Sequence, residues 1–355
     1  MSRFLNKQYV DLEVYTPGEQ PRDMKYIKLN TNESPYPPSQ GVLDIINSEQ
    51  ASLLRLYSDP ECRELKTEIA ALYNVDYENI YLSNGSDDII NFAFMAYTSC
   101  DVPAFFPEIS YGFYKVFAEL YKIPYTKIPL ADDFTVNPKD YSDVGGFVVI
   151  ANPNAPTGRA LTLDEIEDIV SSNPDNVVLI DEAYVDFGGV SCVPLIKKYS
   201  NLLVVQTFSK SRSMAGARLG FAIADKEIIA DLERIKYSTN PYNVNRLTQA
   251  AGVQAIRDND YYLENCKRII KTREWTVSRL ESLGFEIIPS KANFIFVKND
   301  AIDGSVLYEE LKKRGILVRH FSDKKISAYN RVTIGSAEEM SVFIDTVKTI
   351  LEEKK

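Results

Sequence analysis

Histidine and cysteine are scarce in this sequence. Its 355 residues include one histidine, His320, and four widely separated cysteines with no CxxC pair among them. A histidine-rich metal site is therefore disfavoured, and a Ser-His-Asp hydrolase is possible only if His320 itself serves as the base. Without a secretory signal, the cysteines indicate reduced buried thiols rather than disulfides. The chemistry must depend mainly on lysine, aspartate, tyrosine and arginine, or on a bound cofactor.

Long apolar runs and excess positive charge are also missing. The longest apolar segments, such as GGFVVIA and NVVLI, are much shorter than a membrane span, and MSRFLNKQYVDLEVY lacks the apolar core of a signal peptide. The formal net charge of −10 disfavours binding to nucleic-acid phosphates. We therefore expect a cytoplasmic protein with neither a membrane nor a nucleic-acid partner.

What the sequence does contain is the composition of an ordinary globular protein. Hydrophobic residues make up 45% and charged residues 25%, a composition typical of chains that bury a sizeable core. A length of 355 residues favours two domains, or one large domain with an appendage.

Strand-like and helix-like segments alternate along most of the chain. Residues 1–38, rich in proline, asparagine and tyrosine, indicate an extended arm. Between residues 60 and 224, short apolar runs alternate with segments of helix length, a pattern typical of an α/β fold with a mostly parallel sheet. From residue 258 a long helical segment precedes short strands at FEIIP, NFIFV, GILVR and RVTIG, which predicts a smaller α+β layer. The predicted units are an arm at 1–40, a large domain at 41–260 and a small domain at 261–355.

Polar residues follow several of the predicted strands, where an open α/β sheet binds its ligands. After IYLS, the turn Asn84-Gly85-Ser86-Asp87 opens a helix. Gly85 permits a close backbone approach, and the helix N-terminus offers free N–H groups to a phosphate. Alternatively, Ser86 or Asp87 only caps the helix. After FVVIA, the turn NPNAPTG either only reverses the chain or presents a side-chain amide to a ligand.

Asp181 ends the apolar run NVVLI. An ionised carboxylate in that position is costly unless it meets a cation or several hydrogen-bond donors. It either caps the segment that follows or pairs with a protonated heterocyclic nitrogen, an arrangement that keeps both groups ionised. Tyr184, three residues later, could donate a hydrogen bond to the same ligand.

The fourth strand exit is QTFSKSRSMAGARLGF, which follows the apolar run NLLVV. A lysine is usually a solvated surface cation. At a sheet edge beside Arg218, however, Lys210 would lose hydration and face a like charge, and both effects lower a lysine pKa, as Schiff-base chemistry requires. Ser209 and Arg218 could hold a phosphate, whereas Arg212 is expected to be a solvated or supporting cation. The ligand that fits this phosphate cradle, carboxylate, phenol and lysine together is pyridoxal 5′-phosphate.

The segments NPNAPTG, DEAYVDF and SKSRSMAGARLGF resemble the signature blocks of the fold-type I aminotransferases that depend on pyridoxal 5′-phosphate. The similarity covers nearly the whole chain and includes VYTPGEQ, KLNTNESPYPPS, RLYSDPE, PEISYGFY and NPYNVNRLTQAA. It implies a large cofactor-binding domain with a mostly parallel sheet, and a smaller α+β domain formed by the C-terminal part and the N-terminal arm. It also implies a homodimer, with the arm packing on the small domain and on the partner subunit.

The resemblance assigns roles residue by residue. Lys210 would form a Schiff base with the cofactor and move a proton between the substrate α-carbon and the cofactor carbon C4′. Asp181 would pair with the pyridinium nitrogen, and Tyr184 would bond the 3′-oxygen. The other cofactor-binding residues would be Tyr111, stacked on the ring; Gly85, Ser86, Asp87, Ser209 and Arg218, around the phosphate; and Tyr57, which would reach the phosphate from the neighbouring subunit. The substrate would be bound by Tyr15, Asn32, Arg319 and Arg331.

One position departs from the family pattern. The family usually has NPNNPTG, in which the asparagine before the second proline bonds the 3′-oxygen, whereas this chain has Ala155 there. Asn154 or Asn152 could substitute, or Tyr184 could carry the interaction alone. Of these, we predict Asn154.

The resemblance is greatest to the members that transfer an amino group from L-histidinol phosphate to 2-oxoglutarate in histidine biosynthesis. Arg319 and Arg331 could then serve both a phosphate and a carboxylate. Three alternatives stay open: an aromatic amino acid aminotransferase, an enzyme similar to threonine-phosphate decarboxylase, and a non-enzymatic protein on the same fold. The segments VYTPGEQ and NPYNVN favour the first function.

Overall fold

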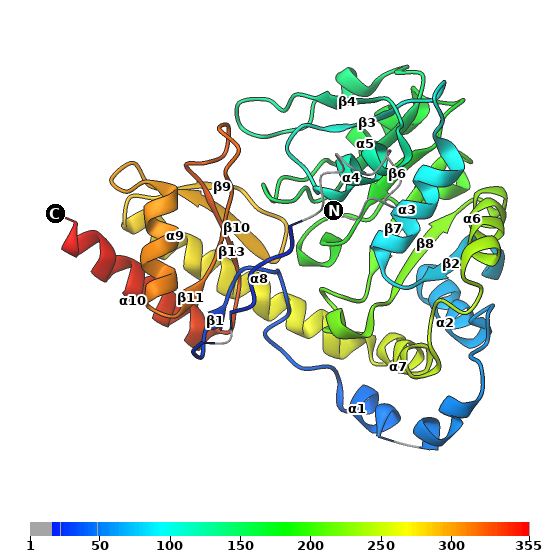
Figure 1. The fold of residues 1–355 in the computed structure, drawn as a ribbon, viewed down its shortest axis with the longest axis horizontal. Helices are drawn as coiled ribbons and strands as arrows, with labels where there is room; N and C mark the ends of the chain where they lie inside the picture. The colour runs from blue at the N-terminus through cyan, green and yellow to red at the C-terminus, as the bar shows by residue number, and fades with distance from the viewer. Residues whose placement is uncertain (1–15, 22, 48, 355) are drawn as a thin grey trace, which may run out of the picture.

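A seven-stranded sheet forms the centre of the larger part of the molecule (Figure 1). The computed structural model describes residues 16–21, 23–47 and 49–354. Neighbouring strands are parallel from β7 through β6, β5 and β3 to β4, and β8 is antiparallel to both β7 and β2. The predicted mostly parallel sheet is therefore confirmed. In order across the sheet, the strands are β2 (Ile80–Ser83), β8 (Gly220–Ala224), β7 (Leu202–Thr207), β6 (Val178–Asp181), β5 (Phe147–Ala151), β3 (Ala104–Pro107) and β4 (Tyr125–Ile128).

Helices cover both faces of this sheet. Successive side chains of a strand point to opposite faces, so Ile80 and Leu82 join one core cluster and Tyr81 joins the other. The cluster that contains Tyr81 packs on α3 (Ser86–Tyr97), α4 (Phe113–Tyr121) and α6 (Lys226–Thr239). The cluster that contains Ile80 and Leu82 packs on α2 (Arg63–Tyr73), α5 (Leu163–Ser171) and α7 (Arg246–Arg257). Burial on both faces explains why the central strands are apolar throughout.

The smaller part of the molecule is built on a four-stranded antiparallel sheet. Its strands, in order, are β12 (Arg319–His320), β13 (Asn330–Thr333), β10 (Phe294–Lys298) and β9 (Glu286–Ile288). Its helices are α8 (Asn259–Ser282), α9 (Gly304–Lys313) and α10 (Ala337–Glu353). The long α8 begins beside the larger part and runs into the smaller one (Figure 1). The domain boundary that we predict after residue 260 falls in the first turn of α8, and the division into domains stays a prediction.

The N-terminal segment joins the two parts. Strand β1 (Ile27–Lys28) pairs in parallel with β11 (Ile316–Leu317) of the smaller part. Residues 29–33 then continue toward the central sheet, and α1 (Gln40–Ile46) packs against α7 on the larger part. The chain therefore crosses from one part to the other close to the carboxyl ends of the central strands.

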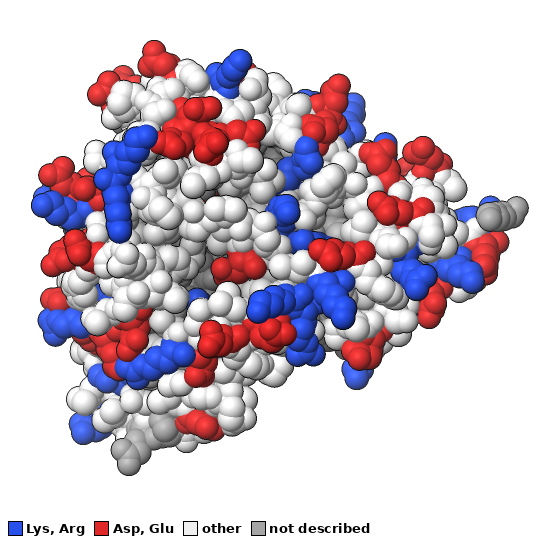
Figure 2. Space-filling model, turned by 180° about the vertical axis from the view of Figure 1, so that it is seen from behind, with Lys and Arg blue, Asp and Glu red and all other residues white. Residues whose placement is uncertain are grey.

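Charged side chains of both signs are interspersed on the surface. On the described part of the face shown in Figure 2, lysines and arginines alternate with aspartates and glutamates around a broad uncharged area, without a continuous basic stripe. Among the residues that the structure describes, no helix has both the length and the apolar composition needed to cross a membrane. The four cysteines are free thiols, and Cys100 is exposed.

Candidate active site

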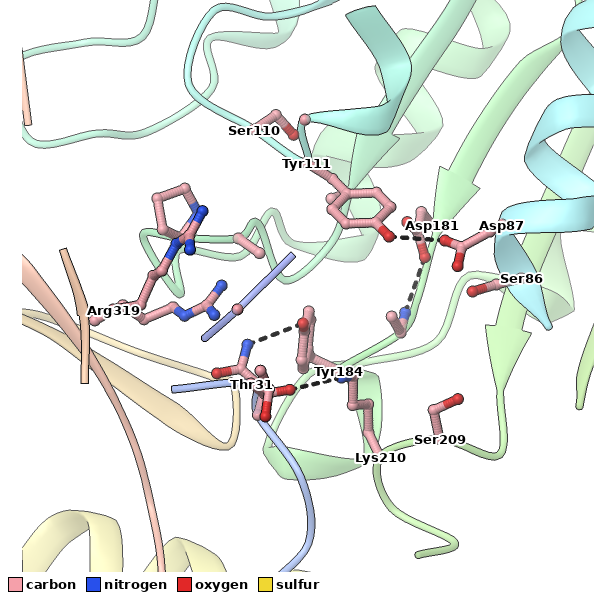
Figure 3. Close-up of a pocket in the computed structure, with 18 of the residues that line it drawn as sticks. Thr31, Ser86, Asp87, Ser110, Tyr111, Asp181, Tyr184, Ser209, Lys210 and Arg319 are labelled. Carbon is pink, nitrogen blue, oxygen red and sulfur yellow. Dashed lines mark hydrogen bonds between the residues drawn. The ribbon is translucent and has the colours of Figure 1, made fainter. Parts of the chain in front are cut away.

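A cavity of about 510 Å³ lies at the carboxyl ends of the central strands (Figure 3). Residues from β5, β6 and β7, from the start of α3 and from the small sheet all contribute to its walls. The sequence-predicted residues that line it are Asn32, Ser86, Asp87, Tyr111, Asp181, Tyr184, Ser209, Lys210, Arg218, Arg319 and Arg331. Gly85, Asn154 and Tyr57 are not among its lining residues, and Tyr15 lies outside the described residues. The structure thus brings together eleven predicted side chains from segments far apart in the sequence.

Lys210 follows β7 and carries its amine into the cavity. Its Nζ donates a hydrogen bond to the carbonyl oxygen of Thr31 at 3.2 Å. Burial, followed by the positive charge of Arg331, lowers the pKa of Lys210 to about 8. An ordinary lysine has a pKa of about 10.4, so a far larger fraction of this amine is neutral near neutral pH. A neutral amine is the nucleophilic form, which is what a lysine needs to react with an aldehyde.

Asp181, the last residue of β6, is only 5% exposed. Its carboxylate accepts a hydrogen bond from the hydroxyl of Tyr114 at 2.9 Å and another from the backbone N–H of Ala183 at 3.2 Å. Burial raises the pKa of Asp181 to about 6, and the bond from Tyr114 acts in the opposite direction. A cation placed beside this carboxylate would keep it ionised. Tyr114 was not singled out in the sequence, although it stands three residues after Tyr111 in SYGFY.

The start of α3 and Arg218 form an anion-binding cradle. Gly85 has a φ of 93°, and a Cβ at this residue would lie 2.6 Å from Nη2 of Arg218. A Cβ at Gly220 would lie 2.4 Å from the backbone nitrogen of Ser86. The positive φ favours glycine at residue 85, and the close approach of backbone from the first turn of α3 requires glycine at residue 220. The free N–H groups of that turn, the Ser86 and Ser209 hydroxyls and the guanidinium of Arg218 suit a phosphate.

Tyr184 and Tyr111 are both held by hydrogen bonds at the cavity wall. The amide of Asn32 donates to the hydroxyl of Tyr184 at 3.0 Å, and the hydroxyl of Tyr111 donates to Asp87 at 2.8 Å. Asp87 also pairs with Arg218 at 3.1 Å. Asp87 therefore connects the aromatic ring of Tyr111 to the arginine of the cradle, a contact that the sequence did not predict.

Two arginines face the cavity from adjacent strands of the small sheet. Arg319 and Arg331 are directly opposite in the β12–β13 register. Arg331 donates to the carbonyl oxygen of Asn30 at 2.9 Å, and Arg319 makes longer bonds to the carbonyl oxygens of Thr16 and Pro17. Like charges opposite each other on neighbouring strands repel. A bound anion would compensate this repulsion, as expected for a substrate carboxylate or phosphate.

The turn around Ala155 does not direct an asparagine amide into the cavity. Ala155 lines the cavity, but Asn154 and Asn152 do not. The amide of Asn154 donates to the carbonyl oxygen of Ile109 and accepts from the hydroxyl of Ser110, at 2.9 and 2.8 Å. These bonds hold the turn to the segment after β3. The role that we predict for Asn154 stays a prediction, whereas Tyr184 is already in place at the wall.

Two further predicted residues lie away from the cavity. Tyr57 is 79% exposed and stacks on Tyr242, with ring centroids 4.6 Å apart. Arg212 is buried and donates to the carbonyl oxygen of Ala255 and to the side chain of Asn259, so the expectation of a solvated cation is wrong, and the alternative of a supporting cation stays a prediction.

Comparison with known proteins identifies the family. The sequence profile described as aminotransferase class I and II matches residues 24–347. The chain belongs to this family. It is 50% identical over 353 residues to the histidinol-phosphate aminotransferase of Brachyspira hyodysenteriae, covering 99% of this chain and all of that protein. It is 48% identical over 351 residues to the enzyme of the same name from Clostridium botulinum strain Kyoto, covering 99% of both chains.

A solved structure shows the same fold for this aminotransferase. The histidinol-phosphate aminotransferase from Clostridium acetobutylicum superposes with a TM-score of 0.85 at 25% identity, over 92% of this chain and 99% of that one. The predicted fold class, a fold-type I aminotransferase with a smaller α+β part, is therefore confirmed.

The cofactor of this family, pyridoxal 5′-phosphate, fits the residues at the site. A lysine of lowered pKa, a buried carboxylate, two phenols and a cradle for a phosphate are the groups that its aldehyde, ring nitrogen, ring and phosphate require. The two glycines let Arg218 and strand β8 lie close against the first turn of α3, where the cradle for the phosphate forms.

Proposed function

We propose that this protein transfers the amino group of L-histidinol phosphate to 2-oxoglutarate in histidine biosynthesis, with pyridoxal 5′-phosphate as its cofactor. The observation that carries this function is the 50% identity, over 99% of the chain, to a curated histidinol-phosphate aminotransferase. The cavity supports it with a low-pKa lysine, a buried carboxylate and a pair of arginines on adjacent strands.

The site residues divide the chemical work. When bound, pyridoxal 5′-phosphate delocalises the electron pair that deprotonation leaves on the substrate α-carbon. Lys210 would hold the cofactor aldehyde covalently, and its Nζ, once released by the substrate amine, would take the substrate α-proton and return it during product formation. The carbonyl oxygen of Thr31, 3.2 Å from Nζ, helps to hold the free amine at the cavity wall.

The other cofactor-binding residues would orient the cofactor and pair with its charged groups. Asp181, fixed by Tyr114, would accept a hydrogen bond from the protonated ring nitrogen, and this cation would keep the carboxylate ionised. Tyr184, fixed by Asn32, bonds the 3′-oxygen, and Tyr111 stacks on the ring. The residues that hold the phosphate are Gly85, Ser86, Asp87 (through its backbone N–H), Ser209 and Arg218.

The arginine pair accounts for two different substrates. Histidinol phosphate has a phosphate and no carboxylate next to its amine, whereas glutamate has two carboxylates. Arg319 and Arg331 stand opposite each other on adjacent strands, with both guanidinium groups near the ring of Phe321, and each can bind either kind of anion with paired hydrogen bonds. We place Arg331, near Lys210, at the α-carboxylate of glutamate and Arg319, together with Tyr15, at the phosphate of histidinol phosphate.

We further propose that the active unit is a cytoplasmic homodimer. Tyr57 is exposed and does not line the cavity of its own chain, which is what a residue directed at a partner's cofactor phosphate requires. Buried free thiols at Cys62, Cys192 and Cys266 suit a reducing compartment.

A survey of amino donors tests the function. The cofactor-loaded protein is mixed with each donor alone, and the loss of its visible absorbance is followed. We expect L-histidinol phosphate to convert the cofactor in one half-reaction and 2-oxoglutarate to restore it. Conversion by phenylalanine or tyrosine but not by histidinol phosphate would assign the protein to aromatic amino acids. Release of carbon dioxide from threonine phosphate would assign it to the decarboxylases.

Lys210→Ala separates an enzyme from a binding protein. We expect it to abolish turnover and the absorbance of covalently bound cofactor, while the exposed Lys197→Ala, a matched lysine control, leaves both unchanged. Retention of turnover in Lys210→Ala would contradict the role of this lysine.

A further inference from the structure

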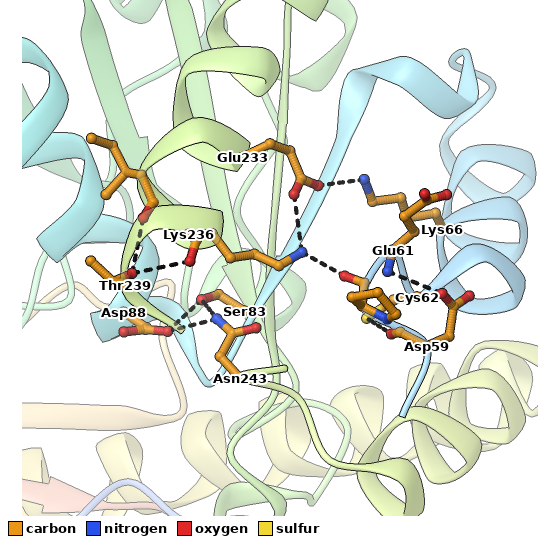
Figure 4. Close-up of polar contacts among 12 residues, drawn as sticks. Asp59, Glu61, Cys62, Lys66, Ser83, Asp88, Glu233, Lys236, Thr239 and Asn243 are labelled. Carbon is orange, nitrogen blue, oxygen red and sulfur yellow. Dashed lines mark hydrogen bonds and ion pairs between the residues drawn. The ribbon is translucent and has the colours of Figure 1, made fainter. Parts of the chain in front are cut away.

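The connection between α6 and α7, residues 240–245, contacts the anion-binding turn of its own chain. The amide nitrogen of Asn243 donates to the hydroxyl of Ser83 at 2.7 Å and to the carboxylate of Asp88 at 3.0 Å (Figure 4). Ser83 itself donates to Asp88 at 2.5 Å. Ser83 ends β2 and Asp88 lies in the first turn of α3, so these three bonds close the turn at residues 84–87 from outside the cavity.

The same connection also holds Tyr57. The ring of Tyr242 stacks on the ring of Tyr57 at 4.6 Å with an interplanar angle of 25°. Neighbouring residues add two hydrogen bonds. The hydroxyl of Ser58 donates to the carbonyl oxygen of Val244 at 2.8 Å, and the side chain of Arg246 donates to the carbonyl oxygen of Tyr57 at 2.6 Å. These three contacts hold the ring and the backbone of Tyr57 against the connection and the first residue of α7.

The helices on either side of the connection also form hydrogen bonds with the segment that follows Tyr57. Lys236 of α6, 1% exposed, donates to the carbonyl oxygen of Pro60 at 2.8 Å and pairs with Glu233 at 3.0 Å (Figure 4). Glu233 also pairs with Lys66 of α2 at 2.7 Å. From α7, Gln249 donates to the carbonyl oxygen of Asp59 at 2.8 Å. Residues 57–60 are therefore held both by the connection and by the two helices that flank it.

We propose that the α6–α7 connection couples the two cofactor sites of the dimer, with Asn243 as a positioning residue. Through Ser83 and Asp88, Asn243 sets the turn that binds the phosphate in its own chain. Through Tyr242 and Val244, the same segment sets the position of Tyr57, which is offered to the phosphate in the partner's site. This inference rests on the proposed homodimer with Tyr57 acting across the interface.

The affinity of the cofactor-free protein for the cofactor tests whether Asn243 positions the phosphate-binding turn of its own chain. Asn243→Ala removes two hydrogen bonds from the turn, and we expect its Kd for pyridoxal 5′-phosphate to rise at least about tenfold. Asn79→Ala is the matched control, because Asn79 also makes two hydrogen bonds, to Asp76 and Ala224, but at the opposite end of β2. Equal Kd values for the two variants would overturn the proposal.

A charge swap distinguishes positioning from a general loss of stability. Asn243→Asp places a carboxylate against that of Asp88 and should weaken cofactor binding more than Asn243→Ala does. Adding Asp88→Asn restores an amide facing a carboxylate, and we expect the double variant to regain most of the affinity. The 31P resonance of the bound cofactor should shift in Asn243→Asp and return in the double variant. A double variant as weak as Asn243→Asp would contradict the proposal.

Hybrid dimers test the coupling itself, with a hybrid of wild-type and Lys210→Ala chains as the reference. In the first test hybrid, a Lys210→Ala chain pairs with an Asn243→Ala chain, so the reactive site has an altered turn and an intact Tyr57 segment. In the second, a wild-type chain pairs with a chain carrying both substitutions, so the reactive site is intact and only the incoming Tyr57 segment is altered. We expect cofactor titration, followed by visible absorbance, to show weaker binding in both.

The outcomes separate this inference from the proposed function. Weakening of the first test hybrid alone would confine Asn243 to its own turn and overturn the coupling. Normal cofactor binding by the wild-type protein without turnover of histidinol phosphate would refute the proposed substrate only. The cofactor titrations of the hybrids would still decide whether the two sites are coupled. A monomeric wild-type protein would overturn both the coupling and the proposed homodimer.

Discussion

At the scale of single residues, the site depends on two ionisable groups whose pKa values move toward each other. Lys210 loses hydration and faces Arg331, which lowers its pKa to about 8, and burial raises the pKa of Asp181 to about 6. In the cofactor-free protein both shifts disfavour charge. A cofactor with an aldehyde for the lysine and a protonated nitrogen for the carboxylate removes both penalties, which is a physical reason for tight binding.

The pH dependence of cofactor capture follows from the lysine. Neutral Lys210 is the reacting form, so the rate of cofactor binding to the cofactor-free protein should rise with pH through a midpoint near 8. Arg331→Met removes a neighbouring positive charge and should raise the midpoint by roughly 0.5–1 unit. Stopped-flow absorbance at a series of pH values gives the midpoint. Arg319→Met is the control and should shift it less, since the main positive charges acting on Lys210 are Arg331 and Arg218.

The same lysine has a defined effect on stability. Its pKa in the folded protein is below its unfolded value, so between pH 8 and about 10.4 the unfolded state binds more protons. The Lys210 contribution therefore makes the cofactor-free protein more stable as the pH rises through this window.

For the rate of cofactor capture, a midpoint above pH 10, or one that Arg331→Met leaves unchanged, would contradict the role of burial and charge at this lysine.

At the scale of elements, the cradle is a contact between a strand and a helix. Strand β8 passes so close to the first turn of α3 that a Cβ at Gly220 would meet the backbone nitrogen of Ser86 at 2.4 Å. Neither the strand nor the helix turn can move aside cheaply, because β8 is hydrogen-bonded on both edges, to β7 and β2. The spacing of two regular elements therefore sets the geometry of the anion site.

Gly220→Ala should damage this contact. We expect the free energy of unfolding to fall by about 1–3 kcal/mol, as for other overpacked sites, and the affinity of the cofactor-free protein for pyridoxal 5′-phosphate to fall at least about tenfold. Gly216→Ala is the matched control, since a Cβ there meets nothing within 4 Å, and it should change stability by less than about 0.5 kcal/mol. Urea unfolding and cofactor titration measure the two effects. Equal stability and equal cofactor affinity of the two variants would show that the close approach of β8 to α3 determines neither quantity.

At the scale of the whole molecule, apolar side chains remain exposed around Tyr57. Leu54 and Leu56 are 56% and 46% exposed, and Leu43 and Ile46 of α1 are also exposed. A second copy of the chain would cover such a surface while it receives Tyr57. Dimer formation would then complete both phosphate sites, because each chain would supply Tyr57 to the site of its partner.

Leu54→Asp tests this assembly. We expect wild-type protein to sediment as a dimer and Leu54→Asp to dissociate, with weaker cofactor binding because Tyr57 no longer reaches a partner. Val342→Asp is the control, because Val342 is 48% exposed on α10, at the other end of the molecule (Figure 1). Sedimentation velocity measures the mass. Dissociation of Val342→Asp instead, or normal cofactor affinity in a monomeric Leu54→Asp, would place the interface elsewhere.

Much of the candidate site could be predicted from local sequence. Asp181 ends one buried strand, Ser209 and Lys210 come shortly after the next, and the carboxyl ends of parallel strands share one edge of a sheet. The contacts of Tyr114, Thr31 and Asn243 could not be predicted, since their partners lie tens to hundreds of residues away. The helices at 226–239 and 246–257 were likewise not singled out by the sequence pattern, although both pack on the sheet.

The sequence by itself determined the alternation of strands and helices and the family to which the chain belongs, because periodicity and contiguous motifs are local properties. Only the tertiary structure decided which neighbours each segment would have. GILVR, predicted as one strand, divides into β11, which pairs with β1, and β12, which pairs with β13. Asn154 is turned toward the segment after β3 by its hydrogen bonds, and Lys210 acquires its low pKa from burial and from Arg331, a residue 121 positions away in the sequence. Orientation and electrostatic environment depend on long-range packing, so the fold sets them.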